Sequence, residues 1–400
     1  MTSGTKGPGR MNAGIVRQAF KKGRNIMKKQ FLASVLGLTM AASLMAGCGL
    51  SGGASTTAAA APAVAETTAA AAAAETKAEE KKEEAAAPAA GAITLRMAEV
   101  NPLENTVCGA MDIKFKEKVE ELSGGSIIID LQGGGVLGVE ADILDGMLGG
   151  TGVVDICRIS AFALTSYGTK KSVLLSLPYT FANREHFWNF ANSELGQEFL
   201  NESEELGLGV KGLYYGEEGF RHFFTVESKP ISSPADMKGM KIRVSNDPLM
   251  QKMVQNLGAT PSPVSMSEIY SSMQNGTIDG AEQPTVNYAG NSFQEVGPNL
   301  TLDGHTLGAM MTVISDKAWA SLTEEQQNII MEAGKEASAY CREVSESKEN
   351  EVLEKLKADG INVIDVPDKT EWQAACKPIA DEYATGDLAE PYQKLLDLAK

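Results

Sequence analysis

The chain has 400 residues, of which 43% are hydrophobic and 22% charged, a composition that allows one or two domains with apolar cores. Its 36 basic and 52 acidic side chains give a net charge of −16, which argues against a nucleic-acid partner because phosphates require clustered Lys and Arg. Three widely spaced histidines and five cysteines without a C-x-x-C pair provide no short metal-binding motif, so we expect no metal site.

The first 48 residues combine a basic stretch with an apolar one. They contain eight Lys or Arg and no acidic residue, and an uncharged run rich in Leu and Ala extends over residues 30–47. This order is typical of a secretory signal. The segment ends in the sequence Met-Ala-Gly-Cys, which resembles a bacterial lipobox except that Met45 replaces the usual Leu. We therefore interpret residues 1–47 as an N-terminal extension with a lipoprotein signal peptide, and we expect lipidation of Cys48.

A membrane-spanning helix that stays attached is the alternative for this apolar run, which is short for a bilayer span of roughly 20 residues. The segment that follows, residues 49–91, cannot form a packed core. Nineteen of its 43 residues are Ala, and Leu50 and Val64 are its only large aliphatic side chains. We interpret residues 48–91 as a lipidated cysteine with an Ala-rich tether, and residues 92–400 as the folded domain. Removing the eight N-terminal basic residues from the total of 36 leaves residues 49–400 with 28 basic and 52 acidic residues, a net charge of −24.

The first part of the domain alternates between strand and helix patterns. Apolar and β-branched residues alternate or cluster at residues 93–97, 127–131 and 153–156, which predicts three strands. Apolar residues at helical spacing predict helices over residues 107–122 and 139–148, each stopped by a pair of glycines. This β-α-β-α-β order predicts an α/β fold with a mostly parallel sheet and helices on its faces.

Helix caps and short β-rich runs define the later elements. One or two helices, broken near Gly196, are expected between residues 187 and 200, and Asp247 is expected to cap a helix that ends at Leu257. Capping boxes open two more helices, and the second of these extends over about 36 residues and suggests a helix that spans two lobes. The capping boxes are Ser265 with Glu268 and Thr323 with Gln326. Strands are expected at residues 209–215, 221–226, 241–244 and 361–366.

A glycine-rich run at residues 133–138 matches G-x-G-x-x-G, and Asp155 lies 17 residues beyond its last glycine. This pattern alone is compatible with a dinucleotide site. However, the following helix begins with Glu140 and Asp142, whose charges repel a pyrophosphate at the helix N-terminus. We therefore interpret the run as a turn and expect no cofactor.

The sequence contains no P-loop, H-E-x-x-H or G-x-S-x-G motif, so no catalytic arrangement stands out. Four cysteines remain after Cys48, and an exported domain could pair two of them in a way that sequence does not specify: Cys108, Cys157, Cys341 and Cys376. Cys341 lies on an apolar helical stripe, which indicates a small core residue.

Two arginines lie beside or within short β-rich segments and next to apolar residues. Arg221 is preceded by Phe220, and Arg243 stands between Ile242 and Val244. An arginine in such a place needs an acceptor, and its planar guanidinium suits a carboxylate. A structural salt bridge and a ligand contact both satisfy this requirement.

Four separate runs resemble the solute-binding proteins of tripartite ATP-independent periplasmic (TRAP) transporters. They are GFRHFF at 219–224, PADMKGMKIRV at 234–244, LGATPSPVSMSEIY at 257–270 and GTIDGAEQP at 276–284. Three shorter pieces agree with the order of the family's motifs, at 123–126, 135–138 and 177–181. The resemblance covers roughly residues 93–385, essentially the whole folded domain.

This resemblance implies a two-lobed periplasmic-binding-protein-like α/β fold that closes on a small organic acid. The long helix that starts at Thr323 would span both lobes. We expect lobe I to comprise about residues 92–215 and 305–340, and lobe II about residues 216–304 with C-terminal segments.

The resemblance also implies ligand contacts. In this family the arginine of the Lys-x-Arg motif, here Arg243, forms a salt bridge with the ligand carboxylate, and the arginine of the Gly-x-Arg motif, here Arg221, commonly assists. Gln283 stands where the family often has Asn, and Met266 where it often has Phe, so the usual specificity assignments do not transfer directly. Three further candidates lie in or beside these motifs: Glu218, Glu282 and Tyr270.

The implied function is that of an extracytoplasmic solute receptor, not an enzyme, that delivers a small organic acid to a TRAP membrane permease. It would be exported and either lipid-anchored to the outer face of the cytoplasmic membrane or periplasmic. Glu217, Glu218 and Glu282 suit either a hydroxyl-rich sugar acid such as a uronate or a structural role. Four-carbon dicarboxylates and keto or hydroxy acids also satisfy one arginine clamp. The alternatives are an exported enzyme acting on an organic acid and a tethered sensory binding protein.

Overall fold

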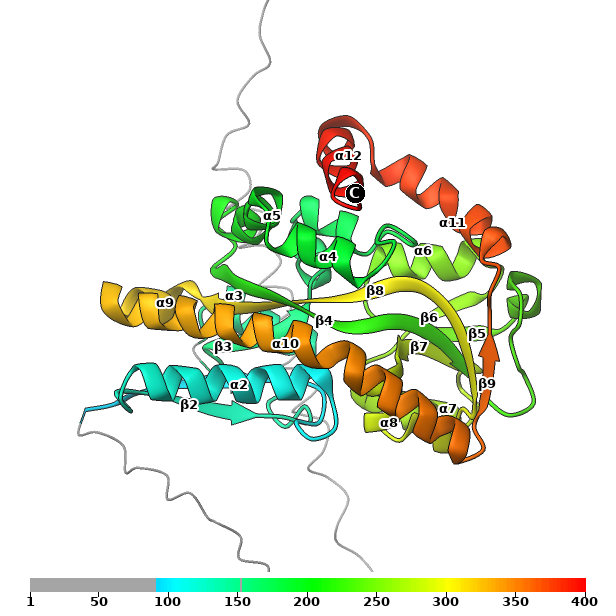
Figure 1. Ribbon diagram of the computed structural model, residues 1–400, viewed down its shortest axis with the longest axis horizontal. Helices are drawn as coiled ribbons and strands as arrows, with labels where there is room; N and C mark the ends of the chain where they lie inside the picture. The colour runs from blue at the N-terminus through cyan, green and yellow to red at the C-terminus, as the bar shows by residue number, and fades with distance from the viewer. Residues whose placement is uncertain (1–90, 152) are drawn as a thin grey trace, which may run out of the picture. The chain divides into compact units, whose positions relative to one another are not determined.

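Figure 1 shows the computed structural model, which describes residues 91–151 and 153–400. In this part of the chain, no helix is both long and apolar enough to cross a bilayer. Cys48, the signal segment and all of the expected tether except Gly91 lie outside the described residues, so the lipobox and the tether stay predictions.

The first half of the sheet is parallel, as the β-α-β-α-β prediction requires. β1 (Ile93–Ala98) pairs in parallel with β2 (Ile127–Gln132) on one side and with β3 (Ile156–Ser160) on the other. The connecting helices are α2 (Val107–Leu122) and α3 (Glu140–Leu148). The apolar positions that predicted α2 form its buried face, which includes Val107, Met111, Phe115 and Val119.

Two long strands join the first half of the sheet to the second. β4 (Val210–Thr225) and β8 (Asn299–Ser315) pair antiparallel with each other. The strand order of the whole sheet is β2-β1-β3-β8-β4-β7-β5-β6, and β9 (Asn362–Asp365) also pairs with β8. The C-terminal part of β8 pairs with β3, whereas the C-terminal part of β4 pairs with β7 (Gly280–Pro284). The second half is completed by β5 (Lys241–Val244) and β6 (Thr260–Pro263), so β4 and β8 cross from one half to the other (Figure 1).

The sequence divided β4 into two strands, and the structure corrects this. The strand is continuous through an irregularity at which its pairing with β8 shifts register, between Glu217 and Phe220. Gly219 lies there at φ +94°, a conformation that glycine adopts readily, so the chain bulges without ending the strand. The sequence pattern did not indicate β8 either, because this strand is almost entirely buried and therefore shows no alternation.

The helical region near residues 187–200 forms two helices, α4 (Arg184–Ala191) and α5 (Glu194–Glu205). Their separation lies at Ser193 and not near Gly196. The Ser193 side chain accepts a hydrogen bond from the Gly196 N–H at 3.1 Å and so caps α5 three residues before the glycine.

Three predicted helix starts are confirmed by their caps. Asp247 accepts a hydrogen bond from the Leu249 N–H at 2.7 Å and opens α6 (Pro248–Asn256). Both capping boxes form, and they precede α7 (Ile269–Gln274) and the 35-residue helix α10 (Glu324–Ala358). These starts depend on bonds within a few residues, which is why the sequence reveals them.

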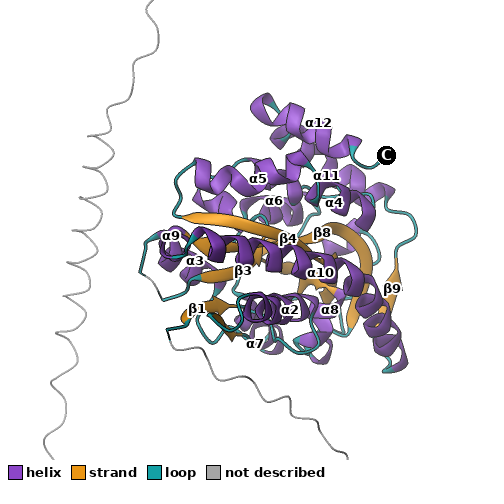
Figure 2. Cartoon of the chain, turned by 60° about the vertical axis from the view of Figure 1, so that its left-hand side comes forward, coloured by secondary structure: helices purple, strands orange, loops and turns teal. Residues whose placement is uncertain are grey.

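Helix α10 lies along the sheet and contacts elements of both halves (Figure 2). It packs against α2 and β4, and it also contacts α8 (Thr285–Gly290) and β9 (Asn362–Asp365). A side chain at Gly334 would stand 2.4 Å from the Tyr214 ring, so glycine permits the close approach of α10 to β4. The prediction of one long helix across both parts is thus confirmed.

The chain closes with α9 (Asp316–Ser321) before α10, and with α11 (Thr370–Tyr383) and α12 (Ala389–Asp397) after β9. Helix α11 packs against α6 and β8, whereas α12 packs against α5. The Leu395 carbonyl also bonds to His186 Nε2 at 2.7 Å. Helix α12 therefore lies beside helices that the sequence assigned to lobe I, and the lobe boundaries stay a prediction.

The four cysteines of the described part are free and buried: Cys108, Cys157, Cys341 and Cys376. The disulfide bond that the sequence left open is therefore absent among these four cysteines. Cys341 lies on the buried face of α10, as its apolar stripe predicted, and burial raises the pKa of its thiol well above the usual range.

Candidate ligand-binding site

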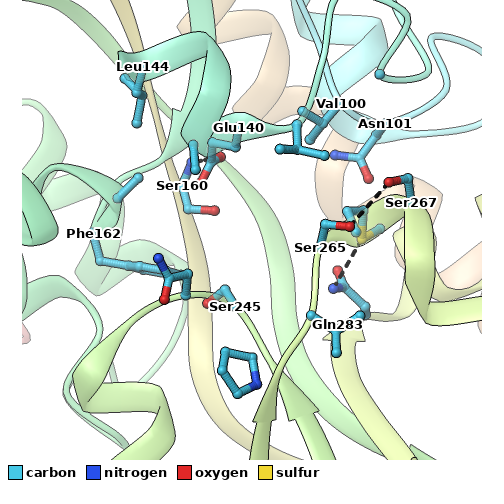
Figure 3. Close-up of a pocket in the computed structure, with 18 of the residues that line it drawn as sticks. Val100, Asn101, Glu140, Leu144, Ser160, Phe162, Ser245, Ser265, Ser267 and Gln283 are labelled. Carbon is cyan, nitrogen blue, oxygen red and sulfur yellow. Dashed lines mark hydrogen bonds between the residues drawn. The ribbon is translucent and has the colours of Figure 1, made fainter. Parts of the chain in front are cut away.

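A cavity of about 320 Å³ lies at the carboxyl ends of several parallel strands, where α/β proteins commonly bind small molecules. Its lining comes from both halves of the sheet. Figure 3 shows Glu140 and Ser160 on one side, and Ser265 and Gln283 on the other. The charged residues of the lining are Glu140, Arg158, Glu218, Arg221 and Arg243.

Arg243 lies in β5 and is 4% exposed, yet it has no carboxylate partner among the described residues. Its Nε–H donates to the Val264 carbonyl at 2.8 Å. Burial lowers the pKa of Arg243 to about 10; the charge of Glu282 opposes this shift, and the charge of Arg221 adds to it. The side chain stays charged at neutral pH, so the cavity contains a guanidinium that is available to an anion.

Arg221 lines the same cavity, but its charge is already neutralised. Its Nη2 donates to Glu282 Oε1 at 3.0 Å, its Nε donates to Glu282 Oε2, and Nη1 lies 3.4 Å from Glu218 Oε1. Burial raises the pKa of Glu282, but Arg221 and His305 outweigh it and hold that pKa at about 2. Glu282 is fully buried behind the cavity wall, where it holds Arg221 in place.

The remaining sequence candidates divide into two groups. Glu218, Gln283 and Met266 line the cavity, and Glu218 Oε2 accepts a hydrogen bond from Asn287 Nδ2 at 2.6 Å. Tyr270 lies outside the lining, and its hydroxyl donates to the Glu295 carboxylate at 2.7 Å. The structure therefore brings Arg243, Arg221, Glu218, Gln283 and Met266 together, with Glu282 behind them, and leaves Tyr270 apart.

Sequence reasoning missed a third arginine. Arg158 in β3 lines the cavity, and its Nε donates to Glu99 Oε2 at 2.5 Å. It stands between the apolar residues Cys157 and Ile159, just beyond the strand predicted at residues 153–156, because β3 begins only at Ile156. Apolar neighbours are the signal that identified Arg221 and Arg243, so a strand predicted at its observed position would have included Arg158. Its partner Glu99 lies 59 residues away in the sequence and has no comparable signal.

The glycine-rich run also contributes to the site. Gly135 and Gly138 lie in the lining at φ +71° and +127°, which is consistent with the predicted turn. Glu140 follows them, and its Oε2 accepts a hydrogen bond from the Ser160 N–H at 3.0 Å. Burial raises the pKa of Glu140 and of Glu218. The lining thus contains one unpaired cation and two acidic groups that can accept hydrogen bonds.

The model of the family described as bacterial extracellular solute-binding protein, family 7, matches residues 97–386. The chain belongs to this family. Its fold is therefore the two-lobed α/β fold of TRAP solute-binding proteins, and the prediction of that family is confirmed. Members of family 7 are solute-binding receptors, and their extracellular class implies export.

Two relatives illustrate the likeness. A solute-binding protein of Roseobacter denitrificans is 32% identical over 265 residues, which cover 66% of this chain and 79% of that protein. A TRAP periplasmic solute binding protein from Bradyrhizobium sp. BTAi1, in complex with α/β-D-galacturonate, is 28% identical with a TM-score of 0.72, covering 76% of this chain and 99% of that one. The crystal structure of the Roseobacter denitrificans protein itself, with bound L-galactonate, aligns at 29% identity with a TM-score of 0.70, covering 76% of this chain and 98% of that one.

Proposed function

We propose that this family 7 receptor binds a polyhydroxylated monocarboxylic acid of the uronate or aldonate class, with the carboxylate on Arg243. The observation that supports this most is the buried guanidinium of Arg243, which has no carboxylate partner among the described residues. A ligand carboxylate would neutralise it and form charge-assisted hydrogen bonds at a buried guanidinium, where such bonds are stronger than in bulk water. Arg221, fixed by Glu282, would assist from the adjacent wall.

The charge distribution favours a sugar acid over a four-carbon dicarboxylate. Arg158 and Arg221 are already bound by Glu99 and Glu282, so a second ligand carboxylate would find no free cation among the described lining residues. It would instead meet the acidic groups of the lining, whereas hydroxyl groups can donate hydrogen bonds to them. The galacturonate and galactonate in the two related structures support the same class.

Calorimetric titration and thermal shift with D-galacturonate, L-galactonate and succinate test this proposal. We expect saturable binding of the sugar acids and weaker binding of succinate. Arg243→Met should lose sugar-acid binding, whereas the matched control Arg342→Met, on the surface of α10, should retain it. Retained binding by Arg243→Met would show that the carboxylate lies elsewhere, and tighter binding of succinate would overturn the sugar-acid class.

We also propose that the receptor binds its ligand without converting it, by closure of the two lobes, and passes it to a TRAP-type permease. The family and the absence of a known catalytic motif in the sequence support this. NMR of the ligand after prolonged incubation with the protein should show no new compound. A product that requires the intact protein would assign an enzyme instead.

Finally, we propose that Cys48 is lipidated and anchors the receptor to the outer face of the cytoplasmic membrane. The lipobox-like sequence and the Ala-rich residues after it support this. Metabolic labelling with radioactive palmitate should mark the wild-type protein and not Cys48→Ser. Equal labelling of both would contradict the anchor.

A further inference from the structure

A polar cluster lies behind the cavity wall, between the sheet and helix α2. Arg158 of β3 and Tyr214 of β4 both pair with Thr312 of β8, so the three side chains project from the same face of the sheet. Helix α2 covers this face, with the ring of Phe115 5.4 Å from that of Tyr214. Asp112 lies one turn before Phe115 on the buried side of the helix.

Asp112 is a fully buried carboxyl group without a hydrogen-bond partner among the described residues. The hydroxyl groups of Tyr214 and Thr312 also lack a partner there. The charged groups that act on Asp112 are Glu99 and Arg158, which bind each other. One guanidinium cannot neutralise two buried carboxylates, and a buried charge without a partner is strongly destabilising.

The other groups around the cluster do not compensate a charge on Asp112. Burial raises the pKa of the Cys157 thiol in β3 and of the Tyr214 hydroxyl in β4 well above their usual ranges, so both stay neutral. Helix α10 contributes Cys341, which is neutral for the same reason. Helix α2 itself contributes Cys108, whose thiol is neutral. On the cavity side, Glu140 and Glu218 act on Arg158, and neither of these acidic residues can compensate a negative charge on Asp112.

We propose that Asp112 binds a proton, so that Asp112 and Glu99 form an acid–carboxylate pair behind the cavity and Glu99 remains free to hold Arg158 in its wall. The Asp112 O–H then has oxygen acceptors on its neighbours Glu99 and Tyr214. Burial, and next the charge of Glu99, raise the pKa of Asp112 well above the usual range, in agreement with this proposal. This proton site does not depend on which acid the cavity binds.

A sodium ion could balance the same charge, but the structure favours a proton. Among the described residues, no group of three or more His, Cys, Asp or Glu side chains is arranged to hold a metal ion. A proton also satisfies the carboxyl group without the five or six oxygen ligands that a hard cation collects.

A proton on Asp112 predicts a distinct pH dependence of the free energy of unfolding. The unfolded chain releases it above about pH 4, whereas the folded protein keeps it, so stability falls as the pH rises from about 4 to the folded pKa. Asp112→Asn has the shape of the protonated acid and does not titrate. The unfolding equilibrium constant of the wild type, divided by that of Asp112→Asn, should therefore rise about tenfold per pH unit and level off above the folded pKa.

Urea unfolding at pH 5, 6, 7 and 8 tests this, in sodium chloride and again in choline chloride. Asp130→Asn is the matched control. Hydrogen bonds from Gln132 and Arg96 lower the pKa of Asp130, so this carboxyl group is ionised in the folded protein from pH 5 to 8. The ratio of the wild-type unfolding equilibrium constant to that of Asp130→Asn should therefore stay constant over this range. A constant ratio for Asp112→Asn as well would mean an ionised Asp112 and would overturn the proposal. Stabilisation of the wild type by sodium that Asp112→Asn lacks would assign a cation and overturn it too.

Infrared spectroscopy provides a test that does not require the variant to fold. At pH 8, above the pKa of about 6 that burial gives to Asp247, the folded wild type should retain a protonated carboxylic C=O band. That band should move when the aspartates are labelled with ¹³C, which separates it from the glutamates Glu140 and Glu218. The absence of a label-sensitive band would overturn the proposal.

Discussion

Replacing Arg243 by Met should stabilise the ligand-free protein while abolishing ligand binding. Burial lowers the pKa of Arg243 from 12.5 to about 10, which disfavours the charged form by about 3 kcal/mol at 1.4 kcal/mol per pKa unit. The hydrogen bond to the Val264 carbonyl offsets about 1 kcal/mol of this. Met retains the apolar stem, so we expect a net gain of about 2 kcal/mol and a melting temperature about 4 °C higher.

The same substitution should weaken ligand binding, by a free energy at least as large as the gain in stability. Loss of one partner of a buried, hydrogen-bonded charge pair costs about 2–5 kcal/mol, so the Kd for galacturonate should rise by about 30-fold to several thousand-fold. Differential scanning calorimetry without ligand and isothermal titration with it measure the two effects separately. A melting temperature several degrees lower would refute the reasoning, because it would show that the Arg243 charge is compensated in the ligand-free protein.

Three further substitutions test other parts of the site and the fold. Glu282→Gln leaves Arg221 without its main partner and should lower the free energy of unfolding in urea by about 3 kcal/mol at pH 7. Because the pKa of Glu282 is lowered to about 2, this loss should persist above pH 4.5 and shrink as the pH falls toward 2. A loss independent of pH would contradict the ion pair of Glu282 with Arg221. Glu218→Gln should weaken galacturonate about tenfold and leave a carboxylate without hydroxyl groups, such as butyrate, nearly unchanged in titration calorimetry, whereas equal losses would exclude a hydroxyl contact. Gly219→Ala places a side chain at φ +94° and should lower stability by about 1–2 kcal/mol in thermal unfolding, and an unchanged melting temperature would show that the bulge relaxes.

The sequence predicted most reliably those features that depend on neighbours along the chain. Capping residues placed the starts of α6 and α10, because each cap bonds to the backbone two or three residues later. The β-α-β-α-β order fixed the parallel first half of the sheet for a similar reason, since short crossovers require it. The family resemblance then identified Arg221 and Arg243 from motifs that need no tertiary information.

The strand pattern failed where tertiary contacts override local cues. β4 runs through its central bulge because β8 pairs with it on both sides of Gly219, although the local sequence reads as two strands. Tyr270 shares a motif with Met266, yet only Met266 lines the cavity, and the Tyr270 hydroxyl bonds to Glu295 instead. A motif places residues along the chain, but the packing of the turn decides which of them face the ligand.

The sequence by itself determined the family, the helix starts and the acidic net charge of the domain. Only the tertiary structure decided which of three similar arginines is free. Arg158 and Arg221 are held by carboxylates 59 and 61 residues away, whereas Arg243 meets no carboxylate among the described residues. The physical reason is that pairing over such separations depends on how the strands lie side by side, which no local pattern encodes. An acidic domain can thus retain one buried cation for an acidic ligand.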